Sequence, residues 1–592
     1  MGFDYWLVHL VWTIPPALVM TAVYWPFFTR LELYKTFTLI TIAVLATIPW
    51  DSYLIRNRIW SYPDDAVVGP TLFAIPLEEL FFFVIQTYNT SLIYIILTKR
   101  LVLPTYLGRP TNALSAIVGD LVILGSFVSG ATGIWFGGSF TYMGLILIWV
   151  CPFMLLQWAM CCRFLLALPR KEVLLSIVIP STYLCMVDNL ALQRGTWVIE
   201  RDTKLGFQVF GSLDIEEFVF FWVTNIMVVF GLVAIDHAIA IAEYQIASSP
   251  GSVKQFPSYG NLILLYVSSR SDTHDSHFLE GLTEAVRTVS QKSQSMYMGS
   301  AMFQGGLRVD LLLLYYFCRV MDDLIDEAPD RQTAELIIEQ CSQALRCKFG
   351  EASAKPENTT PGAKETDNKD ESTAPSLVSS LTLLPASHLT IDPLLGLLAG
   401  FKTDLGFSAK DQSFPIETGD DLETYAYNVA SVVAVSVLQL VFSHHESTVS
   451  VPQKQRDHII RAAERMGQAL QYVNIARDVE HDAEIGRVYI PTTWLNDEDL
   501  KPTDVLAKPH DPRVTKLRNT MLDKADEMYR TSVDAIDELP AEVRAAIRTV
   551  VESYMTIGKV VRKGPRKKAG QGKLKLSLWR RFWVARRAMS TA

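Results

Sequence analysis

Cysteine is scarce in this sequence, with seven among 592 residues, and no two form a CxxC pair or a disulfide-like framework. This excludes a small disulfide-stapled fold, and the cysteines are interpreted as small core residues. The N-terminus lacks the basic segment of a signal peptide, so the first apolar run, 5–28, is expected to be retained. The chain also shows no nucleotide-binding fold. The net charge of −8 excludes little, because a basic tail offsets a more acidic body, and no nucleic-acid partner is expected.

Hydrophobic residues are abundant, at 49% of the chain, and they are distributed unevenly. Residues 1–245 form a series of apolar runs, whereas later residues show ordinary helical patterning with many charges. We predict seven membrane spans, centred near residues 15, 42, 86, 123, 152, 180 and 230, with the second and sixth short. The protein is therefore expected to be an integral, multi-pass membrane protein with at least two domains, in a membrane that the sequence does not identify.

Two segments of this apolar half resemble each other. "IPLEELFFFVIQT" (75–87) and "LDIEEFVFFWVTN" (213–225) align with an offset of 138 positions. Nearly the same offset matches an Asp, a Trp and a Phe-Phe pair in each block. The matched residues are Glu78 with Glu216, Glu79 with Glu217, Asp51 with Asp188, Trp60 with Trp197, and Phe82-Phe83 with Phe220-Phe221. The pattern predicts two parallel repeats, at about 1–100 and 140–240.

The repeat also predicts an orientation. Its two copies are four spans apart, so both acidic pairs are expected on the same side of the membrane. The short loops near residues 30, 100 and 170 hold more Lys and Arg than the others, which favours a cytosolic location for these loops and for everything after residue 245.

A carboxylate pair at the edge of an apolar span is costly when it is ionised. Burial and mutual repulsion predict that at least one glutamate of each pair keeps its proton near neutral pH. A protonated glutamate beside aromatic rings can protonate an alkene, and the ring faces can stabilise the resulting cation. Two alternatives remain: the glutamates cap helices at the headgroup level, or the repeats form a transport site.

The first half resembles the small membrane-type lycopene cyclases, which fungi fuse into one chain. "PWD", "IWSY", "GPTLFAIPLEELFFFVIQT" and "LDIEEFVFFWVTN" carry the resemblance. It implies acid-catalysed cyclisation of the ends of lycopene and related carotenes to β-ionone rings, without net redox change. Asp51, Asp188 and the four glutamates would be the catalytic residues, and the resemblance does not settle which one donates the proton.

The second half is predicted to be all helical, and it carries two aspartate pairs. Asp322 and Asp326 lie four apart in "YYFCRVMDDLIDE", and Asp478 and Asp482 repeat this spacing in "NIARDVEHDAEIGRVYIP". Residues four apart share one face of a helix. Two such faces offer hard oxygen ligands, which would bind Mg²⁺ together with water and diphosphate oxygens. Arg319, Arg477 and Arg487 could balance the diphosphate charge.

These motifs resemble the squalene and phytoene synthase family, an all-α class I isoprenoid synthase bundle. The resemblance implies metal binding by the four aspartates and Asn474, and two geranylgeranyl diphosphates condensed head to head to phytoene. It implies Mg²⁺ (Mn²⁺ is possible) and no NADPH. Asp404 ends a family helix, and Tyr554 is expected to close the prenyl channel. The resemblance places the following residues at the substrate: Ser293, Ser295, Tyr315, Arg319, Tyr425, Val429, Gln471, Asn474, Arg477 and Arg487.

Together the halves resemble the fungal fusion of a lycopene cyclase to a phytoene synthase. A separate phytoene desaturase is expected as a functional partner, because several desaturations separate the two substrates. The alternative is a transport or lipid-binding anchor joined to a squalene-synthase-like enzyme.

The expected domains are a membrane domain at 1–245, a linker at 246–275, a synthase domain at 276–558 and a tail at 559–592. A segment rich in Pro, Ser, Thr, Glu and Lys, 350–378, is predicted to be a disordered insertion. The tail holds twelve Lys and Arg, no acid, and Trp579, Phe582 and Trp583, which favours contact with a membrane surface over a merely solvated tail.

Overall fold

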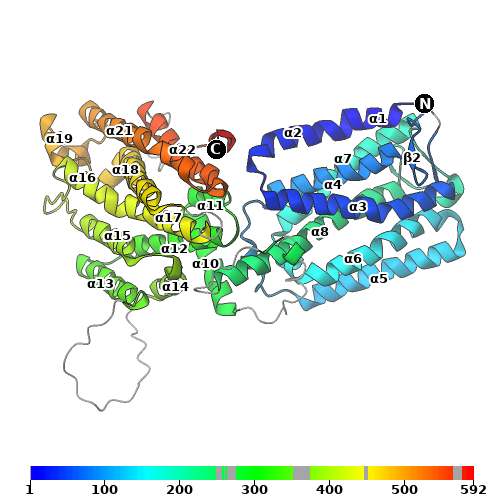
Figure 1. Ribbon diagram of the computed structural model, residues 1–592, viewed down its shortest axis with the longest axis horizontal. Coiled ribbons are helices and arrows are strands. Elements are labelled where there is room, and N and C mark those ends of the chain that lie inside the picture. The colour runs from blue at the N-terminus through cyan, green and yellow to red at the C-terminus, as the bar shows by residue number, and fades with distance from the viewer. Residues whose placement is uncertain are drawn as a thin grey trace, which may run out of the picture. The chain divides into compact units, whose positions relative to one another are not determined.

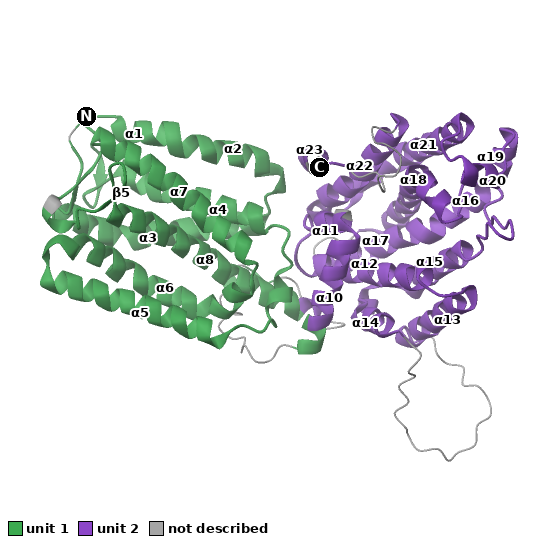
Figure 2. Ribbon diagram, turned by 180° about the vertical axis from the view of Figure 1, so that it is seen from behind, with its two compact units in different colours: residues 1–245, 257–279 green, residues 246–256, 280–592 purple. Residues whose placement is uncertain are grey.

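The computed structural model describes residues 2–63, 65–248, 257–258, 260–262, 275–350, 374–445, 451–564 and 576–591. The chain divides into two compact units, coloured separately in Figure 2. Unit 1 comprises residues 1–245 and 257–279, and unit 2 comprises residues 246–256 and 280–592. Each unit is described by itself.

Unit 1 is a bundle of long apolar helices (Figure 1). It begins with a helical run made of α1 (Asp4–Val8), η1 (His9–Thr13), α2 (Ile14–Tyr24) and η2 (Trp25–Phe27). The helical elements that follow are α3 (Arg30–Arg56), α4 (Leu77–Thr98), η3 (Leu103–Tyr106), α5 (Ala113–Phe136), η4 (Gly138–Phe140), α6 (Thr141–Ala167), α7 (Arg170–Arg194) and α8 (Ile215–Ala247). Seven stretches of this unit are long and apolar enough to cross a membrane. The expectation that the second and sixth are short is wrong, because α3 has 27 residues and α7 has 25.

Short strands, which the sequence did not predict, lie near the N-terminal end of this bundle. They are β1 (Trp60–Ser61), β2 (Thr71–Leu72), β3 (Ile75–Pro76), β4 (Val198–Ile199), β5 (Gln208–Phe210) and β6 (Leu213–Asp214), with η5 (Arg201–Thr203) between β4 and β5. β2 pairs with β3, β5 pairs with β6, and β1 pairs with β4 across the two sequence repeats, all antiparallel.

Each of the two hairpins leads directly into a helix that starts with a glutamate pair. The turn between β2 and β3 holds Phe73 and Ala74 at φ of 55° and 76°, as in a type I′ turn, although neither is glycine. Gly211, at φ of 56°, begins the equivalent turn between β5 and β6. The hairpins therefore fix where α4 and α8 begin, and with them the position of both acidic pairs.

Ion pairs cluster at the opposite end of the unit 1 helices. Lys35 contacts Asp236 at 2.7 Å, Lys99 contacts Glu32 at 2.9 Å, and Arg100 contacts Glu172. Several of the basic residues used to predict orientation are thus neutralised by acids of the same unit.

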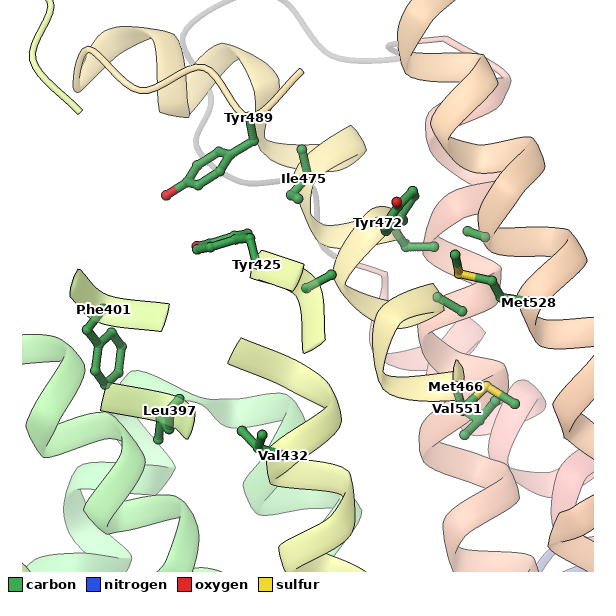
Figure 3. Close-up of a cluster of buried hydrophobic side chains, with 14 of the residues drawn as sticks. Leu397, Phe401, Tyr425, Val432, Met466, Tyr472, Ile475, Tyr489, Met528 and Val551 are labelled. Carbon is green, nitrogen blue, oxygen red and sulfur yellow. The ribbon is translucent and has the colours of Figure 1, made fainter. Parts of the chain in front are cut away.

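Unit 2 is a helical bundle around one large apolar core. Its elements are α10 (Ser276–Lys292, which begins in unit 1), α11 (Gln294–Ser300), α12 (Gly305–Asp326), α13 (Arg331–Lys348), α14 (Pro375–Leu383), η6 (Ala386–His388), α15 (Ile391–Asp404), α16 (Gly419–Ala426), η7 (Tyr427–Ser431), α17 (Val432–His445), α18 (Gln453–Glu484), α19 (Thr492–Asp497), α20 (Pro502–Ala507), α21 (Pro512–Ser532), η8 (Val533–Glu538), α22 (Ala541–Arg562) and α23 (Leu578–Thr591). Figure 3 shows part of the core, where Phe401, Tyr425 and Met466 come from different helices. An eighth stretch with the length and hydropathy of a span, Gly419–His445, lies in this unit.

Several element boundaries differ from the expected domain limits. Most of the insertion, 351–373, lies outside the described residues, but α14 starts at Pro375 and Leu377 is buried, so 375–378 are helical rather than disordered. The tail does not start at a structural boundary, because α22 continues to Arg562. The linker prediction overlaps α8 at its start, and residues 249–256, 259 and 263–274 of it lie outside the described part.

Candidate active sites

The two sequence repeats of unit 1 meet at one small cavity. Its wall contains Glu79, Asp188 and Glu217, together with aromatic side chains from both repeats: Tyr5, Trp60, Phe82, Trp197, Phe220 and Phe221. The cavity encloses about 20 Å³. This is roughly the space of one water molecule, so a larger guest requires side chains to move. The sequence predicts two acidic blocks, and the fold brings them together.

The two glutamates of each pair have different contacts. Glu78 accepts a hydrogen bond at Oε1 from the Val68 N–H at 2.8 Å, and Glu216 accepts one at Oε1 from the Leu205 N–H at 2.7 Å. These first glutamates hold the preceding loops and do not line the cavity. The second glutamates, Glu79 and Glu217, do line it.

Tyrosine hydroxyls bind the second glutamates. Tyr5 and Tyr62 both donate to Oε2 of Glu79, the latter at 2.6 Å. Tyr142 donates to Oε1 of Glu217, also at 2.6 Å, whereas Oε2 of Glu217 is buried without a hydrogen-bond partner in the described part of the chain. The two carboxyl groups that face one cavity therefore differ in their hydrogen bonding.

The two aspartates of the repeats are also buried, at 2% exposure each. Asp188 lines the cavity beside Trp197. Asp51 lies near Glu79, and among the described residues neither of its carboxyl oxygens has a hydrogen-bond partner. The predicted acidic residues are thus all buried at one end of unit 1, and three of the six line the cavity.

Unit 2 contains a much larger cavity, of about 500 Å³. Most of its wall is apolar, from α11, α12, α15, α17, α18 and α22. The predicted substrate and metal residues that line it are Tyr315, Arg319, Asp322, Tyr425, Val429, Gln471 and Asn474, and Tyr554 also lines it. A large, mostly apolar cavity with a few polar groups in its wall suits a prenyl chain with a charged head.

Arginines neutralise the aspartates around this cavity. Arg319 contacts Asp322 at 3.0 Å and also pairs with Asp323 on α12. On α18, Arg477 contacts Asp478 at 2.6 Å. Arg487 contacts Asp326 at 2.9 Å. The two aspartate motifs, 156 positions apart, are thus linked through Arg487, which lies five residues after Asp482.

Burial raises the pKa of the Asp322 carboxyl above its ordinary value, and repulsion from Asp326 and Asp323 adds to this, while Arg319 opposes it. Burial also raises the pKa of Tyr315 to about 12, against a hydrogen bond with Ser293. That bond places Ser293 beside the cavity, whereas the side chain of Ser295 lies outside the described part of the structure.

The buried carboxyl group of Asp404 lies near Asp322, but the sequence analysis did not include Asp404 among the substrate residues. Asp404 lines the cavity and accepts hydrogen bonds from Tyr489 at 2.7 Å and Tyr425 at 2.9 Å. Burial raises its pKa to about 6, although both tyrosines and Arg487 lower it. Figure 3 shows the rings of Tyr425 and Tyr489 with their hydroxyl groups pointing to the same side.

Residues 289–580 match the model of the squalene/phytoene synthase family. Over 608 aligned residues the chain is 50% identical to the bifunctional lycopene cyclase/phytoene synthase of Arthroderma gypseum, covering 99% of this chain and 100% of that protein. It is 47% identical to the protein of the same name from Aspergillus oryzae, with full coverage of both. The chain belongs to the bifunctional lycopene cyclase/phytoene synthase family.

Two solved structures each align with about half of this chain. A dehydrosqualene synthase is 21% identical, with a TM-score of 0.42, and the alignment covers 53% of this chain and 97% of that one. The squalene synthase HpnC from Alicyclobacillus acidocaldarius is 20% identical, with a TM-score of 0.38, over 49% of this chain and 95% of that one.

In this chain, the residues at the two aspartate motifs fit a divalent metal ion. Asn474 Oδ1 is buried without a hydrogen-bond partner in the described ranges, and Asn474 lies one helical turn before Asp478. Its amide nitrogen donates to Gln471 at 3.3 Å, which leaves the oxygen available as a ligand. Asp482 lies one turn beyond Asp478, so α18 presents three oxygen-bearing side chains at a spacing of four residues.

Sequence reasoning missed three tyrosines of the unit 1 site, and a signal for two of them was present. Tyr5 and Tyr142 are 137 positions apart, the same offset that relates Asp51 to Asp188. Each binds the second glutamate of its own repeat. Extending the repeat alignment towards the N-terminus would have found both, but Tyr62 has no such counterpart in the second repeat.

Proposed function

We propose that the two units divide the two activities of the family between them: unit 2 makes phytoene, and unit 1 cyclises the ends of lycopene and related carotenes. The family match over residues 289–580 supports the first assignment. The single cavity lined by Glu79, Asp188, Glu217 and aromatic rings supports the second.

In unit 2, two geranylgeranyl diphosphates condense head to head. Asp322, Asp326, Asn474, Asp478 and Asp482 would hold Mg²⁺, which makes the diphosphate a better leaving group by neutralising its charge. Arg319, Arg477 and Arg487 exchange their aspartate partners for diphosphate oxygens, which planar guanidinium groups bind well.

The apolar wall of the unit 2 cavity then protects the allylic cation from water. Carbon 1 of the ionised substrate bonds to the double bond of the second substrate, and loss of a proton gives the cyclopropyl intermediate prephytoene diphosphate. A second ionisation, rearrangement and proton loss give phytoene. Tyr425 and Val429 line this cavity, where the prenyl chains would lie.

In unit 1, a carboxylic acid protonates the terminal double bond of the carotene. The resulting tertiary cation is attacked by the neighbouring double bond, the ring closes, and loss of a ring proton leaves the β-ionone end. One proton enters and one leaves, so the step needs no redox partner. The cavity in its present form is too small for this end group, so binding must displace the aromatic side chains.

The two cavity glutamates suit two different roles. Glu79 accepts two tyrosine hydroxyls on one oxygen, and such donors stabilise an anion. Glu217 accepts one, and its other oxygen is without a partner among the described residues. Glu217 is therefore the proposed proton donor and Glu79 the proposed acceptor of the ring proton, as in other sites where environment separates two carboxyl groups.

The seven long apolar helices of unit 1 are the proposed membrane spans. The acidic cavity lies at the start of α4 and α8. The loops near residues 30, 100 and 170 are proposed to be cytosolic, and so is everything after residue 245. In α23, Trp579 and Trp583 are 69% and 45% exposed, which suits insertion at a lipid surface.

Expression of the full chain in cells that make geranylgeranyl diphosphate tests this proposal. Phytoene should accumulate when no desaturase is present, and cyclic carotenes should appear when a lycopene-forming desaturase is added. Accumulation of squalene-type products, or of lycopene without rings, would contradict the assignment to unit 2 or to unit 1, respectively.

A further inference from the structure

A second cluster of metal-ligand side chains lies in unit 2, away from the cavity of the synthase site. Asp310 of α12, His388 of η6 and His444 of α17 each offer one ligand atom, and these atoms lie within 4.8 Å of one another. None of the three lines the large cavity. Asp310 precedes Asp322 by twelve residues on the same helix, which separates them by about 18 Å.

The charge balance of the cluster favours a cation. Asp310 is 4% exposed, and within the described ranges the His444 ring is the hydrogen-bond partner of its carboxylate, with 2.6 Å between Nε2 and Oδ2. A buried carboxylate without a positive charge beside it leaves a charge imbalance that costs free energy. A metal ion bound by the same atoms removes that imbalance.

The second histidine is oriented as a metal ligand. His388 Nδ1 lies 2.6 Å from the Ser443 hydroxyl, and the two imidazole rings lie with centroids 5.3 Å apart. Metal-binding histidines usually bond through one ring nitrogen while a neighbouring polar group holds the other. The contact with Ser443 leaves His388 Nε2 as the ligand atom.

We propose that Asp310, His388 and His444 bind one Zn²⁺ ion that fastens η6 to α12 and α17. Two imidazoles and one carboxylate are the ligands of a borderline metal such as zinc, whereas Mg²⁺ prefers oxygen ligands alone. A tetrahedral zinc site needs ligand atoms about 3.3 Å apart. The widest pair must therefore close, and the 2.6 Å contact between Asp310 and His444 must open, each by on the order of 1 Å. A solvent molecule fills the fourth position.

The test uses the purified full chain in detergent, stripped with a chelator and titrated with Co²⁺ or Zn²⁺ in the presence of excess Mg²⁺. Wild-type protein should bind about one Zn²⁺ per chain, with Co²⁺ giving the intense visible absorption of a four-coordinate site. His388→Gln and His444→Gln should weaken binding at least about 100-fold, and Ser443→Ala about 10–100-fold. Zn²⁺ should also raise the thermal midpoint of unit 2 in wild-type protein.

His445→Gln is the matched control, because His445 follows His444 on the same helix and lies outside the cluster. It should bind Zn²⁺ like the wild type. Asp322→Asn combined with Asp478→Asn should also retain the Zn²⁺, since those aspartates belong to the other site. Absence of a four-coordinate Co²⁺ spectrum in wild-type protein would overturn the proposal, as would loss of the spectrum in either control. The wild-type spectrum decides even where a histidine variant fails to fold.

Discussion

Gln86 donates a hydrogen bond from its side-chain amide to the hydroxyl of Thr224 at 2.9 Å. The two residues are 138 positions apart, the same offset that separates Glu79 from Glu217. Residues related by the sequence repeat therefore touch each other across the centre of unit 1. The contact joins α4 to α8 two turns beyond the acidic pairs, which is why both second glutamates reach one cavity.

Replacing the proposed proton donor should remove one activity only. Glu217→Gln keeps the size and the acceptor oxygen of the side chain but cannot supply a proton, so ring formation should fall about 10²–10⁴-fold. Phytoene formation by the same protein should be unchanged, which serves as an internal measure of folding. Carotenes extracted from a lycopene-producing host and from a desaturase-free host give the two readouts.

Glu216→Gln is the matched control for that variant. Glu216 is the adjacent residue, equally buried, and its Oε1 accepts the Leu205 N–H, a role that a glutamine oxygen can fill. The cyclisation rate of this variant should stay within about fivefold of wild type, because the buried Leu205 N–H keeps its hydrogen-bond acceptor. Equal losses of ring formation in Glu217→Gln and Glu216→Gln would refute the proposal that only the second glutamate of the pair takes part in catalysis.

The metal requirement of phytoene formation should depend on Asn474. Asn474→Ala removes an amide oxygen that has no hydrogen-bond partner in the described part of the chain, so it should raise the Mg²⁺ concentration for half-maximal rate about tenfold or more. Activity should largely return at saturating Mg²⁺. Gln468→Ala, six residues earlier on α18 and outside the cavity lining, should leave the Mg²⁺ dependence unchanged. An unaltered Mg²⁺ dependence in Asn474→Ala would exclude this residue as a ligand.

For both sites, the sequence predicted candidate residues more readily than the way in which the fold brings them together. The i,i+4 spacing of Asp322 with Asp326 fixes a shared helix face, so the metal motifs could be predicted locally. That Arg487 bridges to Asp326 depends on how a loop after α18 folds back onto α12, which no local pattern contains.

The repeat likewise predicted that Glu79 and Glu217 are equivalent, but not that they share a cavity. Sharing it depends on the packing of α4 against α8 and on β1 pairing with β4. The short hairpins before α4 and α8 were missed because their strands have two or three residues, and the turn at Phe73-Ala74 lacks glycine. Such segments have no period-two pattern long enough to recognise.

The stability of unit 2 should depend on pH through Asp404. Its pKa is about 6 in the folded chain, against an ordinary value of 3.8, so the folded state holds a proton that the unfolded state has released between these values. The stabilisation is fully present below about pH 4 and is lost as pH rises to about 6, with a total of about 3 kcal/mol. Thermal midpoints of wild type and Asp404→Asn, measured from pH 4 to 7, should therefore diverge, with wild type losing stability relative to the variant.

Asp392→Asn is the control for the pH experiment, because Asp392 lies on the same helix, α15, and is exposed. Its midpoint should follow that of wild type at every pH. A constant difference between wild type and Asp404→Asn across this range would show that the buried carboxyl does not titrate as proposed.

The buried pair of Lys35 and Asp236 should behave differently from a surface ion pair. The two side chains are 8% and 1% exposed and 2.7 Å apart, and Tyr94 donates to the other oxygen of Asp236 at 2.8 Å. Lys35→Met leaves a buried carboxylate with one hydroxyl donor, which should cost about 3–5 kcal/mol. Adding Asp236→Asn removes the charge while keeping an acceptor for Tyr94, so the double variant should recover most of that loss.

Arg331→Met, which breaks an exposed pair with Glu335 in unit 2, should cost under about 1 kcal/mol. Thermal unfolding in detergent measures all three variants, and a double variant no more stable than Lys35→Met would show that the loss comes from packing of the lysine stem rather than from the unpaired charge.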